Sequence, residues 1–276
     1  MEKILVPTDF SENADVALKY ALQLSRSIGL SDIYLLNATS VPVNPGDTFV
    51  PVTTILLEDS QKLMAEYKQK VETWEESQGF TFHVHSAVDD AVTAIKNYAD
   101  KIKPDLIIMG TKGASGIEEF LFGTVSAAVL DHSEYPVLVI PGKTIYRKPE
   151  SLAFFADLKS LEIKDTLRVL KNLCIALEAQ LHLVHVSDDA VMDENELKEK
   201  RELLDYFHGL TMQFHVVTSE SIYTGMEIFM YDFQPDMVAV LSRRYSFFER
   251  IFKSSMSKRV AHRTFLPLLS MKEKED

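Results

Sequence analysis

The feature of this sequence that most constrains its fold is an internal repeat. Phe154–Asp157 has the apolar-to-acidic pattern of Val6–Asp9, and the two segments lie 148 residues apart. The segment Leu181–Val184 matches Ile33–Leu36 at the same offset. Self-similarity at a fixed offset indicates that one structural unit occurs twice, so a fold proposed for the first half must also serve the second.

A second set of matches places the end of each copy. Pro235-Asp236 repeats Pro104-Asp105 at an offset of 131, and a polar segment, Pro141–Glu150, lies between the copies. Each copy is then about 140 residues long, which is the size of an ordinary domain. We therefore predict two tandem domains, residues 1–145 and residues 146–276.

Within the first copy, short apolar runs alternate with amphipathic segments. Ile4–Val6 is typical of a strand buried on both faces, and helices are expected from about Glu12 to Ile28 and from about Leu57 to Gln78. A third strand is expected at Phe82–Val84, which we align with Phe214–Val216 of the second copy. Strands that alternate with helices predict a parallel sheet covered by helices on both faces.

Composition excludes several classes of function. The formal net charge of −12 argues against a nonspecific nucleic-acid binder, because phosphate contacts need clustered cations. No apolar run approaches the length of a membrane span, and Met1–Phe10 lacks the apolar core of a signal peptide. A single cysteine, Cys174, excludes an intramolecular disulfide framework. We therefore expect a cytoplasmic protein.

The strongest candidate site follows the apolar run Leu106–Met109. Three glycines and a threonine form the pattern G-x2-G-x9-G-[ST], at Gly110, Gly113, Gly123 and Thr124. Glycine lets the backbone adopt positive φ and approach a ligand closely, and a helix N-terminus offers unpaired N–H groups to an anion. This order predicts a phosphate site. The alternative is that the glycines only shape a turn and permit close packing.

The second copy keeps the spacing of this motif but loses its glycines. At the offset of 131, Gly110, Gly113 and Gly123 are replaced by Leu241, Arg244 and Ser254. Each replacement adds a side chain where the first copy has none. We expect the second copy to keep the fold and to lose the phosphate site.

The second copy also carries a basic cluster between Leu241 and Arg263. Its cations oppose one acid, Glu249, in a protein of net negative charge. One interpretation is a site for an anionic ligand or an acidic partner; the other is a solvated or packing surface. The cations are Arg243, Arg244, Arg250, Lys253, Lys258, Arg259 and Arg263.

The whole chain resembles a tandem universal stress protein, on the strength of the glycine motif, the Pro7-Thr8-Asp9 strand end and the Pro136–Ile140 strand. The resemblance implies an adenine-nucleotide alpha-hydrolase-like α/β fold. In it, each copy is a parallel five-stranded sheet of order 3-2-1-4-5 with helices on both faces. It also implies ATP between the ends of strands 1 and 4, where strand order reverses and open sheets bind ligands.

The resemblance assigns roles to individual residues. Asp9 and the backbone at Ala38 would line the adenosine pocket, although Asp9 is equally compatible with a turn role because Asp157 persists in the second copy. Thr124 and Ser126 would donate hydroxyl groups to phosphates, and Mg²⁺ or Mn²⁺ would bind through phosphate oxygens. The full set is Pro7, Thr8, Asp9, Ala38, Met109, Gly110, Thr111, Gly113, Gly123, Thr124, Val125 and Ser126.

Three classes of function follow from this. An ATP-binding stress-response regulator with an unidentified protein partner is preferred, the second copy serving as an interaction or structural domain. A slow ATPase lacks a recognisable base or arginine finger, and a nucleotide-independent scaffold would leave the glycine motif without a role. The resemblance also implies pairing of the two copies as a pseudo-dimer, with homodimerisation left open.

Overall fold

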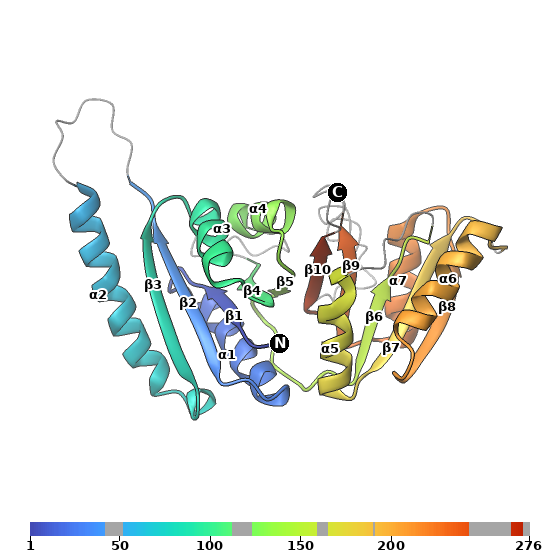
Figure 1. The fold of residues 1–276 in the computed structure, drawn as a ribbon, viewed down its shortest axis with the longest axis horizontal. Coiled ribbons are helices and arrows are strands. Elements are labelled where there is room, and N and C mark those ends of the chain that lie inside the picture. The colour runs from blue at the N-terminus through green and yellow to red at the C-terminus, as the bar shows by residue number, and fades with distance from the viewer. Residues whose placement is uncertain (42–51, 112–122, 159–164, 190, 243–265, 273–276) are drawn as a thin grey trace. The chain divides into compact units, whose positions relative to one another are not determined.

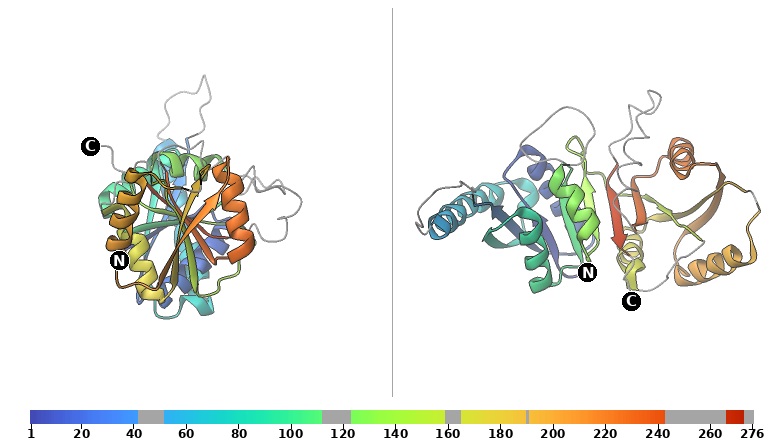
Figure 2. Two further views of the ribbon diagram at one scale, coloured as in Figure 1. Left: turned by 90° about the vertical axis from the view of Figure 1, so that its right-hand side faces the viewer. Right: turned by 90° about the horizontal axis from the view of Figure 1, so that it is seen from above.

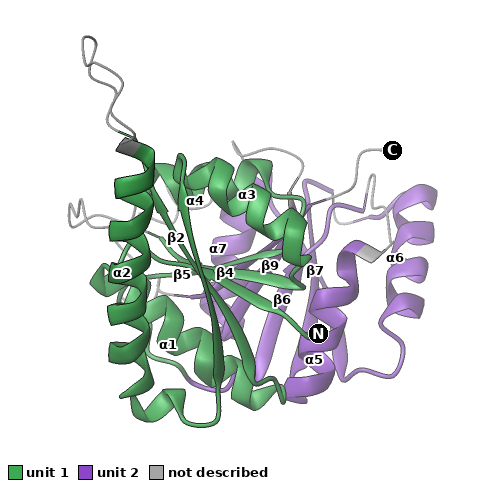
Figure 3. Ribbon diagram, turned by 60° about the vertical axis from the view of Figure 1, so that its left-hand side comes forward, with its two compact units in different colours: residues 1–118, 122–146 green, residues 119–121, 147–276 purple. Residues whose placement is uncertain are grey.

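A computed structural model describes residues 1–41, 52–111, 123–158, 165–189, 191–242 and 266–272. The chain divides into two compact units, shown in different colours in Figure 3. Unit 1 comprises the described residues up to Tyr146, and unit 2 comprises those from Arg147 onward.

Unit 1 is a parallel five-stranded sheet whose strands occur in the order β3-β2-β1-β4-β5 (Figure 1). Right-handed crossovers place α1 and α2 on one face of such a sheet and α3 and α4 on the other. The elements are β1 (Ile4–Pro7), α1 (Glu12–Ser27), β2 (Asp32–Thr39), α2 (Val52–Glu72), a short 3₁₀ helix (Glu75–Ser77), β3 (Thr81–Val88), α3 (Ala91–Ile102), β4 (Leu106–Gly110), α4 (Thr124–His132) and β5 (Val137–Ile140).

Unit 2 repeats this arrangement, with strand order β8-β7-β6-β9-β10 and parallel pairing throughout. Each unit therefore has the predicted order 3-2-1-4-5, and the predicted fold class is confirmed. Two further views are given in Figure 2. The elements are β6 (Ser151–Phe155), a 3₁₀ turn (Asp165–Leu167), α5 (Arg168–Leu177), β7 (Gln180–Ser187), α6 (Glu194–Tyr206), β8 (Met212–Thr218), α7 (Ile222–Phe233), β9 (Met237–Ser242) and β10 (Leu268–Lys272).

The repeat extends to individual hydrogen bonds. In unit 1, Asp105 Oδ2 accepts a bond from the backbone N–H of Glu2 at 2.6 Å. In unit 2, Asp236 Oδ2 accepts the same bond from Glu150 at 2.9 Å. Because each aspartate precedes the fourth strand of its unit and each donor precedes the first, the carboxylate joins the two central strands at their amino ends. The residues that sequence comparison paired thus have the same structural role.

One predicted alignment between the copies is wrong. Leu36 of β2 faces His85 of β3, and Val184, its equivalent at the offset of 148, faces His215 of β8. His215 therefore corresponds to His85 and not to His83. The error is two residues because a slip of two keeps every side chain on its own face of the sheet, which leaves the apolar pattern unchanged.

Helix α2 begins at Val52, five residues before the predicted start at Leu57. Its first residues, Val52, Thr53 and Thr54, are β-branched, and their low intrinsic helix propensity conceals the start of the helix in the sequence. The core of unit 1 is built on the strand residues Ile4, Leu5 and Val6, which are fully buried. Among the helices of the described ranges, none is long and apolar enough to cross a membrane.

Candidate functional site

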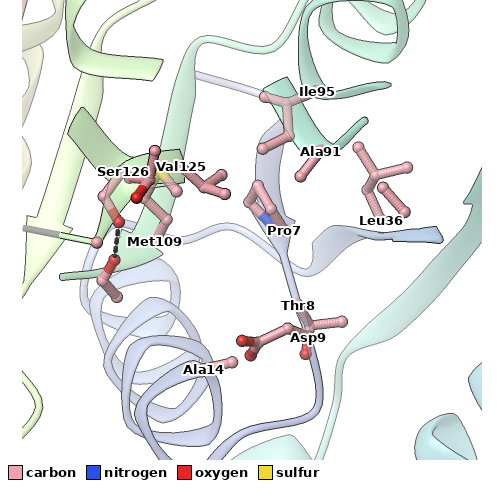
Figure 4. A pocket seen from close by; sticks show the side chains of 14 residues that line it. Pro7, Thr8, Asp9, Ala14, Leu36, Ala91, Ile95, Met109, Val125 and Ser126 are labelled. Atoms are coloured by element: carbon pink, nitrogen blue, oxygen red, sulfur yellow. Dashed lines mark hydrogen bonds between the residues drawn. The ribbon is translucent and has the colours of Figure 1, made fainter. Parts of the chain in front are cut away.

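A pocket of about 410 Å³ lies at the carboxyl ends of β1 and β4 in unit 1 (Figure 4). Strand order reverses at this point, because β1 pairs with β2 on one side and with β4 on the other. Open α/β sheets form their ligand crevice at such a reversal. The lining residues are Pro7, Thr8, Asp9, Ala14, Leu36, Ala38, Ala91, Ile95, Met109, Gly110, Gly123, Thr124, Val125 and Ser126.

The pocket brings together ten of the twelve candidate residues. Thr111 does not line it. Its carbonyl oxygen accepts a hydrogen bond from the N–H of Gly123. Gly113 lies outside the described residues. The other ten candidates come from the ends of β1, β2 and β4 and from the first turn of α4.

Gly110 permits close packing. A Cβ atom built on it would lie 3.0 Å from the backbone oxygen of Asn13 in α1. Gly110 and Gly123 are also absent from the glycines with positive φ in the described residues. Neither glycine therefore supplies a left-handed backbone, and Gly110 instead allows the close approach of α1 to β4.

The N-cap residue of α4 has no side chain that could cap the helix. Ser11 and Asp90 each accept hydrogen bonds from the first turn of their helices, α1 and α3. Gly123 occupies the corresponding position of α4, with φ −62° and ψ 156°, and offers no side chain. Gly123 therefore occupies none of the N–H groups of this first turn, which lie with the positive end of the helix dipole at the pocket wall.

The two hydroxyl residues at the start of α4 differ in their surroundings. Thr124 is exposed, whereas Ser126 is buried. The Ser126 hydroxyl donates to the carbonyl oxygen of Gly110 at 2.8 Å, the bond drawn in Figure 4. Its proton is thereby used within the protein, so the expected role of Ser126 as a hydroxyl donor to phosphate does not fit this arrangement.

Asp9 lies at the pocket and also takes part in a turn. Its side chain is exposed and lines the pocket, and its Oδ1 accepts the backbone N–H of Ser11 at 3.1 Å. Thr8 has a parallel role, because its Oγ1 accepts the N–H of Phe10 at 3.0 Å. The carboxylate is therefore oriented by the turn that it stabilises.

Four lining residues were not predicted: Ala14, Leu36, Ala91 and Ile95. They carry no polar side chain, so no chemical signal marks them in the sequence. Ala91 and Ile95 lie four residues apart at the start of α3 and share one helix face. Their spacing after the N-cap residue Asp90 is the one sequence pattern that could have indicated a wall of the pocket. With Leu36 and Ala38 they form a largely apolar slot.

In unit 2 the equivalent positions carry larger side chains. At the offset of 148, Pro7 becomes Phe155 and Ala38 becomes Val186. Phe155 is buried, with its ring 5.8 Å from that of Phe229. A Cβ atom on Gly225 of α7 would lie 2.4 Å from Val186 Cγ1, so α7 packs directly on this side chain. The slot of unit 1 is thus filled by side chains at the corresponding place in unit 2.

Other polar clusters are separate from the pocket. Within the described ranges, no group of three or more His, Cys, Asp or Glu side chains is arranged to hold a metal ion. His182 Nδ1 and His215 Nε2 lie 3.0 Å apart in unit 2, and burial lowers the pKa of both imidazoles, with the neighbouring His215 adding to the effect on His182. The predicted anion-site residues Arg243, Arg244, Arg250 and Lys253 lie outside the described residues.

Comparisons with known proteins agree with this architecture. The model of the universal stress protein family matches residues 1–141. Universal stress protein MJ0531 of Methanocaldococcus jannaschii is 29% identical over 142 residues, which is 50% of this chain and 81% of that protein. Universal stress protein MJ0577 of the same organism is 31% identical over 156 residues, 51% of this chain and 96% of that protein.

Among solved structures, a universal stress protein from Archaeoglobus fulgidus aligns over 99% of this chain and 97% of its own, with 23% identity and a TM-score of 0.69. At this identity the likeness establishes the fold. It extends over both units, including the one that lies beyond the family match.

Proposed function

Because the chain belongs to the universal stress protein family, we propose that unit 1 binds ATP and that the protein is an ATP-binding regulator. One observation carries the proposal: a single pocket combines an apolar slot with a helix N-terminus whose N-cap residue is a glycine. A nucleotide complements both parts of the pocket, because it has a flat base and a polyanion. The volume of about 410 Å³ lies within the range of small-molecule sites.

The proposed pose follows the chemistry of the lining. The base lies in the slot between Leu36 and Ala38 on one side and the α3 residues Ala91 and Ile95 on the other. The ribose hydroxyl groups donate to the Asp9 carboxylate. The phosphates lie at the start of α4, where the N–H groups of the first turn and the Thr124 hydroxyl donate to their oxygens.

A divalent cation fits this site only in company with the phosphates. Since the described residues hold no metal-binding cluster, Mg²⁺ or Mn²⁺ would take most of its ligands from phosphate oxygens and water, as Mg²⁺ commonly does. Asp9 is the carboxylate in the lining that could add a protein ligand. The ion would neutralise phosphate charge.

Regulation by binding is preferred to hydrolysis because of the side chains that line the pocket. Among the described lining residues, Asp9 is the one titratable group, and none is Arg or Lys. Fast phosphoryl transfer depends on cations that stabilise the developing charge. Unit 2, with its slot filled, is proposed to present a surface to a partner and not to bind a second nucleotide.

Calorimetric titration of the full chain tests this proposal with four ligands: ATP, adenosine, tripolyphosphate and GTP. Ala91→Phe fills the slot and should weaken ATP binding at least about tenfold, while tripolyphosphate binding should change little. Ile222→Phe, at the equivalent position of unit 2, is the matched control and should leave ATP binding unchanged. Equal ATP affinity in the wild type and in Ala91→Phe would refute the proposed site.

A further inference from the structure

The turn between β1 and α1, residues Thr8–Ser11, contains a strained residue. Phe10 has φ 63°, in the left-handed region that a bulky non-glycine residue seldom adopts. Such a conformation persists where surrounding contacts enforce it. Two hydrogen bonds inside the turn contribute, from the N–H of Phe10 to Thr8 Oγ1 and from the N–H of Ser11 to Asp9 Oδ1. Asp9, which lines the pocket, sits next to the strained residue.

Tyr67 of α2 contacts this turn from outside. Its ring meets the Phe10 ring edge-on, with 5.0 Å between centroids. Its hydroxyl donates to Asp15 Oδ1 in the first turn of α1 at 2.6 Å, and Lys70 Nζ holds the other oxygen of Asp15 at 2.7 Å. Tyr67 is 5% exposed. Tyr67 therefore contacts both the strained residue, Phe10, and the helix that follows it, α1.

The Tyr67 hydroxyl is a donor over the whole physiological pH range. Burial, and after it the hydrogen bond to Asp15, raises the pKa of Tyr67 well above its usual value. The phenol therefore stays protonated, and the short bond to the Asp15 carboxylate is charge-assisted, which makes it one of the stronger kinds of hydrogen bond.

A second connection from α2 to the turn belongs to the fold in general. Ser60 donates to Asn37 Oδ1 at 3.0 Å, and Asn37 Nδ2 donates to the Thr8 carbonyl oxygen at 2.8 Å. In unit 2 the equivalent of Asn37 is His185, whose Nδ1 lies 3.3 Å from the Ala156 carbonyl oxygen and whose Nε2 lies 3.5 Å from Glu196 Oε1 of α6. This connection is present in both copies, so it does not distinguish the unit that carries the glycine motif.

The contact of Tyr67 with Phe10, in contrast, is not present in both units. The equivalent of Phe10 in unit 2 is Leu158, which is fully buried and has no ring for an edge-on aromatic contact. The aromatic contact between Tyr67 and Phe10 is thus specific to unit 1, where the pocket is open.

We infer that Tyr67 is a positioning residue for the pocket: it holds the Thr8–Ser11 turn so that Asp9 presents its carboxylate to the ligand. This inference rests on the proposed nucleotide site. Tyr67 does not line the pocket and acts through Asp9.

The anchoring itself is tested without nucleotide, by amide hydrogen exchange on the full chain. Tyr67→Phe keeps the ring and removes the bond to Asp15, so the Phe10 and Ser11 amides should exchange about tenfold faster. Tyr146→Phe is the matched control, because it also removes one 2.6 Å hydroxyl contact, to Ser27 at the other end of α1. It should leave both amides unchanged. Unchanged exchange in Tyr67→Phe would overturn the inference whatever the protein binds.

The link to the ligand is tested by a double-mutant cycle with Asp9→Ala. Tyr67→Phe should weaken adenosine and ATP binding about tenfold in the wild-type background, have almost no further effect in Asp9→Ala, and spare tripolyphosphate. Equal losses in both backgrounds would mark a merely structural role and overturn the inference. A wild-type chain that binds no adenine nucleotide would instead refute the proposed function, and the link from Tyr67 to a ligand with it.

Discussion

Ser126 donates its hydroxyl proton to the carbonyl oxygen of Gly110 over 2.8 Å, and this bond joins the first turn of α4 to the last residue of β4. Ser126 is buried, while Thr124, two residues earlier, is exposed at the pocket. The two hydroxyl groups that follow the glycine motif therefore have separate tasks. One orients the helix, and the other is available to a ligand.

Substitutions at Ser126 and Thr124 should have opposite effects on stability and on ATP binding. Ser126→Ala removes a buried hydrogen bond and should lower the free energy of unfolding of unit 1 by about 1–2 kcal/mol. Thr124→Val should leave stability nearly unchanged and weaken ATP binding a few-fold. Urea unfolding followed by the fluorescence of Trp74, the single tryptophan of the chain, reports on unit 1. Stability loss in Thr124→Val alone would contradict this division of roles.

Asn13 limits the side chain that can replace either of two glycines. A Cβ atom on Gly110 would meet the Asn13 backbone oxygen at 3.0 Å, whereas one on Gly142 would meet its side-chain Oδ1. Since backbone cannot move aside, Gly110→Ala should cost about 1–3 kcal/mol. Gly142→Ala should cost less than about 1 kcal/mol, because the Asn13 side chain can rotate. Trp74 fluorescence in urea again measures both.

Removal of the Asn13 side chain separates the two cases. Asn13→Ala should restore the stability lost in Gly142→Ala, relative to Asn13→Ala alone, and should not restore that lost in Gly110→Ala. If Asn13→Ala rescued Gly110→Ala, the obstacle would be the side chain, and the close approach of the α1 backbone to β4 would not be the reason for glycine at this position.

Contact between α7 and β7 explains why the slot of unit 2 is filled. Gly225→Ala would bring a methyl group against Val186, and we expect about 1–3 kcal/mol of destabilisation. Val186→Ala in the same chain should recover most of this loss. Hydrogen exchange of the β7 amides measures the free energy of opening of unit 2 separately. Additive effects of the two substitutions would show that the side chains do not meet.

Acidification should weaken unit 2 through its histidine pair. Burial lowers the pKa of His182 and of His215 below the ordinary value of 6.5. The unfolded chain then binds protons more readily than the folded one, so stability is full above about pH 6.5 and falls as the pH drops below it. Proton NMR titration of the two imidazoles should give midpoints below 6.5, and His215→Gln should flatten the pH dependence of unfolding. Midpoints above 6.5 would contradict the assigned cause.

Much of this architecture could be predicted from the sequence because it follows from local pattern. The offsets of 148 and 131 carry the pairing of Ile4 with Leu106 onto that of Leu152 with Met237, as the strand register confirms. These strands are continuous apolar runs with marked ends. The third strands are less distinctive, and a slip of two residues leaves their pattern intact, so the match of His215 to His83 was wrong.

The residues of the candidate site also divide into those that local sequence pattern predicts and those that it does not. Residues directly after strand ends, such as Asp9 and Gly110, could be predicted because parallel strands deliver them to one edge of the sheet. Ala91 and Ile95 could not, since their role depends on the packing of α3 over that edge. The purpose of Gly110 was also hidden, because the neighbour that requires it, Asn13, is distant in sequence.

We propose that the start of α4 receives the phosphates of a nucleotide, and substitution of Gly123 tests this directly. Its φ and ψ lie in the extended region that N-cap residues adopt, so Asp and Asn can both replace it and cap the helix. The two variants are isosteric and differ in one negative charge. Stability should be equal to or above that of the wild type in both, as urea unfolding would show.

Calorimetric titration of ATP into Gly123→Asp and Gly123→Asn is therefore the decisive measurement. We predict that the aspartate variant binds ATP at least about tenfold more weakly than the asparagine variant, because its carboxylate repels the phosphates at close range, while adenosine binds to both variants alike. Equal ATP affinities in the two variants would contradict the assignment of the phosphates to this helix.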